Sequence, residues 1–321
     1  MTKFPIAREP VEDTTRLNIG YERTCNCPPT HINCLSAKQW IKKQVAIWEC
    51  YYEKRDVRDK DVHPAAFPIS LPAQCIELFT HSGELVIDPF VGTGSTLVAA
   101  QDLRRNAVGF DLKPEYVELA NSRLTERSLF DTKTKQIALL ADSHDIPGYL
   151  HEESVALCVT SPPYANMLNT KRLNKSMRSD LRRNKHYLRE LQYSNDTRDL
   201  GTMEVEQYAS SIGDIYKGIF PLLKPKGRCI INVNDLWQNN RRTLIHVHII
   251  EALRSVGYEL RNIIIWDKRN LVNKVGIFGW PSNYITLSIT FEYILDFWKP
   301  PQAAPAKVKR KATKRVLGES K

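Results

Sequence analysis

The strongest constraint on the fold is a regular alternation between short apolar runs and segments in which apolar residues recur at helical spacing. Seven runs fit strands, each four to seven residues long: 85–88, 107–110, 136–140, 155–160, 229–233, 263–266 and 291–297. Strands that alternate with helices form a mostly parallel sheet with helices on both faces. The sequence therefore predicts an α/β fold built on one doubly wound, seven-stranded mixed sheet.

Segments that break this alternation set the predicted domain boundaries. Residues 1–59 form an irregular arm with one helix, because apolar residues from Ala37 to Trp48 fall at helical spacing. Residues 60–299 form the main domain, and residues 300–321 form a disordered basic tail. A polar insertion at about 165–203 carries nine lysines and arginines, which favours contact with a DNA backbone over the alternative of a solvated loop.

The charge balance points to a polyanionic partner. The chain has a formal net charge of +10 at pH 7. Nucleic acid is the simplest such partner, although a basic balance also occurs in proteins that merely stay soluble. No apolar run approaches the roughly 18 residues of a membrane span, and the first residues lack the apolar core of a signal peptide. We therefore expect a soluble, cytoplasmic protein that does not contact a membrane.

The seven cysteines of the chain are expected to be reduced thiols, because their number is odd and no secretion signal is seen. Cys25, Cys27, His31 and Cys34 offer four soft ligands that could hold a tetrahedral Zn²⁺ or a cluster. One residue between Cys25 and Cys27 is not the spacing of a standard zinc finger. We favour an irregular arm without metal, and the metal question stays open.

The turn after the first strand has the composition of a ligand-binding loop, and it contains Asp88, Pro89, Phe90, Gly92, Thr93, Gly94 and Ser95. Its glycines let the backbone approach a ligand closely. Asp111 ends the second strand 17 residues after Gly94 and can accept hydrogen bonds from ribose hydroxyls. The loop therefore predicts a site for a nucleoside-containing ligand.

The identity of that ligand follows from what the loop lacks. A dinucleotide fingerprint needs a third small residue where this chain has Leu97. Asp88 would repel a pyrophosphate but suits a positively charged group, such as the amino group of S-adenosylmethionine. An NAD-dependent oxidoreductase is the alternative from another class, but we find no catalytic His or Tyr-Lys pair for it.

Ser161-Pro162-Pro163-Tyr164 closes the strand at 155–160, where chemistry gathers in open α/β sheets. The two prolines remove two backbone donors and stiffen the turn, so the Ser161 and Pro162 carbonyls are spare acceptors. One hydroxyl and one aromatic face lie beside them. We interpret these four residues as catalytic, and a plain proline turn is the alternative.

Together, 88–95 and 161–164 resemble the paired signature motifs of DNA amino-methyltransferases, which methylate cytosine N4 or adenine N6. The resemblance extends over about residues 60–299, with the cofactor half before the catalytic half. Further similar segments are 63–68, 111–116, the Ala141-Asp142 pair, the turn at 223–227, and the late strands at 265–268 and 292–295, which wall the base pocket in this family.

The resemblance implies a Rossmann-like methyltransferase fold, S-adenosylmethionine as cofactor and double-stranded DNA as substrate. Phe67 then lines the methionine end of the cofactor, Asp111 binds the ribose, and Asp142 lies beside the adenine. Ser161 at the first motif position is more typical of the N4-cytosine members, and adenine N6 is the alternative. The expected role is the modification enzyme of a restriction-modification system, whose cognate endonuclease acts on the same site without stable binding.

The implied reaction is direct displacement. The Ser161 hydroxyl and the Pro162 carbonyl accept hydrogen bonds from the N–H groups of the target amine, while Tyr164 stacks on a flipped-out base. C5-methylation of cytosine would need a cysteine just after a proline, and the chain has no Pro-Cys pair. RNA, protein glutamine and a non-catalytic DNA-binding role are weaker alternatives, since the glutamine-modifying relatives carry Asn at the position of Ser161.

Overall fold

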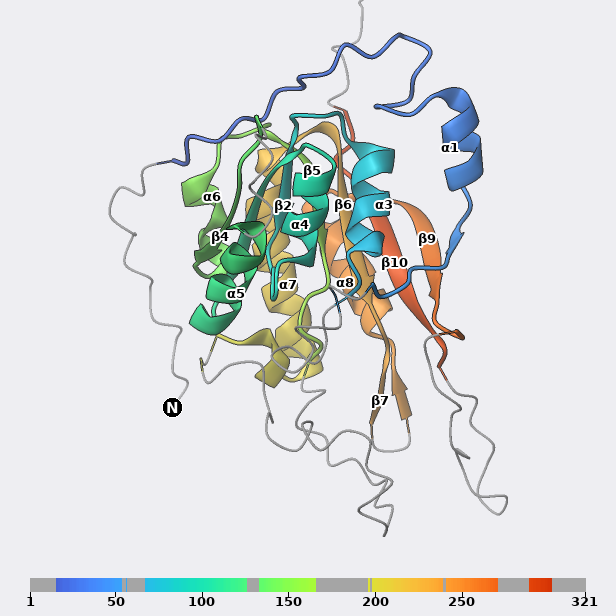
Figure 1. Ribbon diagram of the computed structural model, residues 1–321. Helices are drawn as coiled ribbons and strands as arrows, with labels where there is room; N and C mark the ends of the chain where they lie inside the picture. Colours follow the sequence, from blue (N-terminus) through green and yellow to red (C-terminus); the bar gives the residue numbers. More distant parts are fainter. Residues whose placement is uncertain are drawn as a thin grey trace, which may run out of the picture.

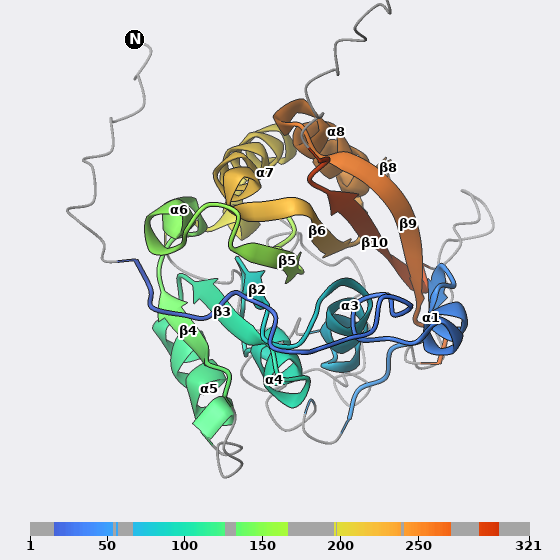
Figure 2. The same cartoon turned by 90° about the horizontal axis from the view of Figure 1, so that it is seen from above.

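The computed structural model describes residues 16–53, 56, 67–125, 133–165, 196, 198–238, 241–270 and 289–301. Their core is a sheet of eight strands in the order β1-β9-β10-β6-β5-β2-β3-β4 (Figures 1 and 2). The strands are β1 (Ile47–Trp48), β2 (Leu85–Asp88), β3 (Asn106–Asp111), β4 (Gln136–Leu140), β5 (Val155–Thr160), β6 (Leu223–Val233), β9 (Glu259–Asp267) and β10 (Phe291–Trp298). Only β10 is antiparallel to its neighbours, β6 and β9.

All seven predicted strands lie in this sheet, and the predicted doubly wound α/β fold is confirmed. The eighth strand, β1, comes from the arm, where the prediction of a helix through Trp48 is wrong. Helix α1 (Ala37–Lys43) starts at a capping box of Ser36 and Gln39 but contains no buried residue. After it, Ile47 and Trp48 pair with Ile265 and Trp266 of β9. The apolar residues from Ala37 to Trp48 that suggested one helix therefore belong to an exposed helix and to a separate edge strand.

Helices cover both faces of the sheet, as Figure 2 shows. One face carries α3 (Ser70–Phe79), α4 (Ser95–Asp102) and α5 (Pro114–Thr125), and the other carries α6 (Ile146–Tyr149), α7 (Val205–Ile219) and α8 (Ile245–Val256). Side chains alternate between two apolar cores along each central strand. On β6, Cys229 and Ile231 enter one core, while Ile230 enters the other. Burial on both faces explains why these strands are continuous apolar runs.

The carboxyl ends of β2, β3, β4, β5 and β6 meet at one edge of the sheet because these strands are parallel. The hairpin of β7 (Leu236–Gln238) and β8 (Arg241–Thr243) follows β6 and lies at the same edge. The arm runs along the opposite edge (Figure 1). No helix among the described residues is long and apolar enough to span a bilayer.

Several predicted segments lie outside the described residues: the arm before residue 16, residues 63–66, most of the basic insertion, 271–288 and the tail from 302. The predicted domain boundaries therefore stay predictions. From the insertion, Ala165, Asp196 and residues 198–203 are described, including a 3-10 turn at Leu200–Thr202.

Candidate functional site

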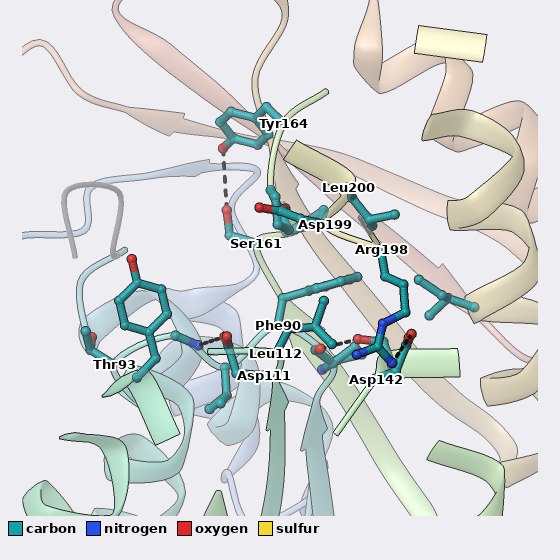
Figure 3. Close-up of a pocket in the computed structure, with 18 of the residues that line it drawn as sticks. Phe90, Thr93, Asp111, Leu112, Asp142, Ser161, Tyr164, Arg198, Asp199 and Leu200 are labelled. Carbon is teal, nitrogen blue, oxygen red and sulfur yellow. Dashed lines mark hydrogen bonds and ion pairs between the residues drawn. The ribbon is translucent and has the colours of Figure 1, made fainter. Parts of the chain in front are cut away.

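A pocket of about 930 Å³, open to solvent, lies where the strands β2, β3, β4 and β5 end (Figure 3). It brings together both predicted motifs. The predicted residues that line it are Phe67, Pro89, Phe90, Gly92, Thr93, Ser95, Asp111, Asp142, Ser161, Pro162, Pro163 and Tyr164. Segments up to about a hundred residues apart thus form one cavity, and the parallel sheet is what places them together.

Asp88 and Gly94, predicted to touch the cofactor, do not line this pocket. The Asp88 side chain is fully buried and accepts hydrogen bonds from Thr96 Oγ1 and Thr160 Oγ1, both at 2.5 Å, and from Phe90 N at 3.0 Å. Burial raises the pKa of Asp88 to about 6. This carboxyl group holds the loop to the end of β5, directly before Ser161. Its expected contact with a charged ligand stays a prediction, and the buried side chain faces the protein interior.

Gly94 serves the packing of two helices. Its φ is +84°, and a Cβ at this position would lie 2.8 Å from the Cβ of Ala120 in α5. Only glycine allows both this backbone conformation and this approach of α4 to α5. Gly92, by contrast, lines the pocket, and its N–H donates to Asp111 Oδ2 at 3.0 Å.

Asp111 ends β3 and faces the pocket (Figure 3). Its two oxygens accept hydrogen bonds from the backbone N–H groups of Gly92 and Lys113, each at 3.0 Å. Burial raises the pKa of Asp111 to about 6 in spite of these donors. Each carboxylate oxygen has a further lone pair, so the group can still accept from two hydroxyls of a ligand.

Asp142 forms another wall of the pocket, at the end of β4. It accepts from His144 N at 2.9 Å, pairs with His144 Nδ1 at 2.7 Å, and lies 3.4 Å from Arg198 Nη1. Burial works to raise the pKa of Asp142, but the hydrogen bonds from His144 outweigh it and lower that pKa. Arg198, which we had grouped with the DNA-contacting insertion, lines the pocket instead.

Ser161 and Tyr164 stand before a buried polar network. Ser161 Oγ is 3.4 Å from Tyr164 Oη and 3.5 Å from Asn232 Nδ2. The carboxylate of Glu292 accepts from Asn232 Nδ2 at 2.7 Å and from Tyr164 Oη at 3.4 Å, and it forms an ion pair with Lys268. Asn232 Oδ1 is buried and has no partner among the described residues. Asn232 Nδ2 therefore lies between Ser161 Oγ and the Glu292 carboxylate.

Sequence reasoning missed several residues of the site. Asn232 had a local signal, because it is the one polar residue in the apolar run at 229–233. Lys268 and Glu292 fell within the late strands named above but were given no role. Val91, Leu112 and Tyr116 lie within the segments at 88–95 and 111–116 but were given no role. The other lining residues were assigned no role from the sequence, and the tertiary fold brings them to the pocket: Ser143, His144, Arg198, Asp199, Leu200 and Ile215.

The donors and acceptors of the pocket fit a nucleoside with a short charged chain. Asp111 suits ribose hydroxyls, and the flat apolar surface of Phe90 suits a purine ring. Backbone groups of the 89–95 loop remain close to the cavity without a bulky side chain at Gly92. The same pocket is lined by Ser161 and Tyr164, so a ligand held by Asp111 and the loop would lie beside them.

Comparison with known proteins identifies one family. The sequence profile of the N6/N4 methyltransferase family, described as DNA methylase, matches residues 8–122 and 155–318. The type II methyltransferase M.BglI of Bacillus subtilis is 32% identical over 113 residues, which are 35% of this chain and 31% of the relative. M.MjaI of Methanocaldococcus jannaschii is 40% identical over 72 residues, 21% of this chain and 22% of the relative.

A third relative, the type II methyltransferase M.XycI of Xanthomonas campestris pv. cyanopsidis, is 45% identical over 62 residues, 19% of this chain and 21% of the relative. The alignments thus span about a third or less of these relatives. Among solved structures, magnesium protoporphyrin IX methyltransferase of Synechocystis has a TM-score of 0.38 and 11% identity over 68% of this chain and 71% of its own.

Proposed function

Because the chain belongs to the N6/N4 DNA methylase family, we propose that it is a site-specific DNA methyltransferase that modifies an exocyclic amino group. The observation that carries this proposal is the shared pocket of the 89–95 loop and Ser161–Tyr164. The family membership confirms the resemblance drawn from those two motifs. The type II names of the relatives support a role as the modification enzyme of a restriction-modification system. The cognate endonuclease would act on the same DNA site without stable binding.

The cofactor is S-adenosylmethionine, which supplies an electrophilic methyl group when bound. Asp111 accepts hydrogen bonds from its ribose, and Asp142 and Phe90 flank its adenine. Phe67 and the 89–95 loop hold its methionine end. Asp88 supports this arrangement from beneath, since it ties the loop to β5 through Thr96 and Thr160.

Ser161 and Pro162 activate the target amine by accepting hydrogen bonds from its two N–H groups. The nitrogen lone pair of a nucleobase amine is delocalised into the ring, so it attacks poorly until the nitrogen becomes pyramidal. Two acceptors favour that change and leave the lone pair directed at the methyl group. The new N–C bond forms as the S–C bond breaks, and the nitrogen then loses one proton. The catalytic contribution is positioning and electrostatics, without a covalent intermediate.

A route for that proton leads away from Ser161. Ser161 Oγ, Tyr164 Oη and the Glu292 carboxylate follow one another at 3.4 Å steps. Such spacings are long for hydrogen bonds, but they can tighten when substrate fills a site. Glu292 is paired with Lys268, whose side chain is 24% exposed. When Glu292 takes up the proton, the remaining charge on Lys268 therefore lies within reach of solvent.

The DNA duplex would lie along the pocket edge of the sheet. Arg241 and Arg242 of β8 and Arg269 after β9 are exposed there. Their charges can contact phosphates on either side of a flipped-out base, in line with the net charge of +10. The basic insertion at about 165–203 would add further contacts to the DNA backbone.

We assign the modified atom to N4 of cytosine, with N6 of adenine as the alternative. The assignment rests on Ser161 at the first motif position. The family includes both N6 and N4 methyltransferases, so membership alone does not separate the two bases.

Incubation with tritium-labelled S-adenosylmethionine and DNA, RNA or a protein extract tests the proposed activity. We expect label in DNA alone, and Ser161→Ala should lose most of the turnover while it binds the cofactor as wild type does. Label in RNA or protein would contradict the proposal, and loss of cofactor binding in Ser161→Ala would contradict the role of Ser161.

A further inference from the structure

Three cysteines and one histidine converge at the edge of the sheet opposite the pocket. The ligand atoms of Cys25, Cys27, Cys34 and His81 all lie within 4.8 Å of one another. Cys34 Sγ is 3.6 Å from Cys25 Sγ and 3.7 Å from Cys27 Sγ. His81 Nδ1 is 3.3 Å from Cys25 Sγ and 3.8 Å from Cys34 Sγ. All four side chains are half-buried.

The four separations given above match edges of a tetrahedron around one small ion, and the other two pairs of ligand atoms lie within 4.8 Å of each other. Zinc lies about 2.3 Å from thiolate sulfur and about 2.0–2.1 Å from imidazole nitrogen. Ideal tetrahedral angles then separate two sulfurs by about 3.8 Å, and a sulfur from a nitrogen by about 3.5 Å. The observed distances fall close to both values. They are too long for a disulfide, whose sulfurs lie about 2.05 Å apart, and the cysteines are free.

We propose that Cys25, Cys27, Cys34 and His81 bind one structural Zn²⁺ ion. Three thiolates and one imidazole are a ligand set that selects zinc, and a single ion suits ligand atoms this close together better than a multi-iron cluster. Protein atoms fill all four positions, so no position is left for a water or substrate. The ion therefore has a structural role, and this site is independent of the proposed methyl transfer.

The cluster differs from the sequence expectation in its fourth member. We grouped the cysteines with His31, which does not belong to the cluster. The proposal of a zinc ion also departs from our expectation of an arm without metal. His81 takes that place from the turn between α3 and β2, 47 residues after Cys34. The single residue between Cys25 and Cys27 is not the spacing of a standard zinc finger, and the fourth member of the cluster lies far from them in the sequence.

The surroundings of the cluster suit a thiolate-bound ion. The backbone N–H of Ser82 donates to Cys34 Sγ at 3.3 Å, as metal-bound thiolates commonly require. A zinc ion with three thiolates and a neutral histidine carries a net charge of −1. The guanidinium of Arg105 is 4% exposed and donates to Thr80 O at 2.7 Å and to Ser82 Oγ at 3.4 Å, so a buried cation lies beside the cluster.

The ion would fasten the arm to the main domain. Thr24 N donates to Ser82 O at 2.7 Å, and the Asn33 amide donates to Leu78 O at the end of α3. Few apolar side chains of the arm are buried, since Leu35 is the first fully buried one among the described residues. A metal can replace the apolar core that such a segment lacks. The fastened arm then delivers β1 to the edge of the sheet.

Metal analysis of the full-length protein tests this proposal. We expect about one zinc ion per chain by mass spectrometry, and Co²⁺ substitution should give the visible absorption bands of a tetrahedral thiolate site. Removal of the zinc with a chelator should lower the melting temperature and make three further thiols reactive. Zinc at a small fraction of the protein, iron with the absorption of a cluster, or a disulfide among these cysteines would each overturn the proposal.

Two histidine variants provide the matched comparison. His81→Ala should lose the Co²⁺ bands or bind the metal far more weakly. His31→Ala should keep both zinc and bands, because His31 is outside the cluster and its Nδ1 has no partner among the described residues. Equal loss in both variants would contradict the assignment of His81. If His81→Ala does not fold, the chelator titration of the wild-type protein still decides the question.

Discussion

Replacing Gly94 by alanine tests how the cofactor loop is built. The new Cβ would lie 2.8 Å from Ala120 Cβ and 3.1 Å from Ala120 Cα, and Gly94 has a φ of +84°. A non-glycine residue in this left-handed conformation costs about 1–2 kcal/mol. Overpacking against a rigid helix costs about 1–3 kcal/mol. The loss of unfolded-state entropy returns about 0.4–1 kcal/mol, so the free energy of unfolding should fall by about 1–5 kcal/mol.

Urea unfolding followed by circular dichroism measures this change, and calorimetry measures the affinity for S-adenosylmethionine. We expect weaker cofactor binding as well, because α5 or the loop must shift to admit the methyl group. Gly213→Ala in α7 is the matched control. Its Cβ would meet only Ala252 Cβ, at an ordinary 3.8 Å, so helix propensity should stabilise this variant by up to about 1 kcal/mol. Equal stability of Gly94→Ala and wild type, or equal losses in both variants, would refute the reasoning.

Three further predictions concern the reaction and the DNA. Burial raises the pKa of Asp111 to about 6. Protonation below that pH removes an acceptor, so cofactor affinity should fall about tenfold between pH 7.5 and 5. If Asp111→Asn showed the same pH dependence as wild type, this role of Asp111 would be refuted. Glu292→Gln should lower kcat with little change in cofactor affinity, because the amide cannot take up the proton; a change in KM for the cofactor alone, in steady-state kinetics, would speak against the proton route. Arg242→Ala should weaken DNA binding at low salt and reduce the slope of log K against log salt by about one, whereas Lys135→Ala, exposed at the opposite edge of the sheet, should leave the slope unchanged.

The sheet could be predicted because its strands are buried on both faces, which makes each one a continuous apolar run in the sequence. The pocket followed from the same logic, since parallel strands place their carboxyl-terminal turns at one edge. The two-residue strand β1 could not be predicted, because its pairing with β9 depends on residues more than two hundred positions away.

Long-range contacts also decide where the predicted site residues lie. Asp88 looks like a ligand-facing acid in the sequence, and its hydrogen bonds with the hydroxyls of Thr96 and Thr160 show that it faces inward. His31 is close to the three cysteines in the sequence, but the fold brings His81 to them instead. For the cysteine cluster, the sequence indicated the correct type of residue, a histidine, at the wrong position.

The most direct test of the central claim is the identity of the methylated nucleoside. DNA of mixed sequence would be incubated with the purified protein and labelled S-adenosylmethionine, digested to nucleosides and separated by liquid chromatography with mass detection. We predict label in N4-methylcytosine, and none when Ser161→Ala replaces the wild-type protein. Label in N6-methyladenine would contradict the assignment of the base, and unlabelled DNA would contradict the proposed methyl transfer itself.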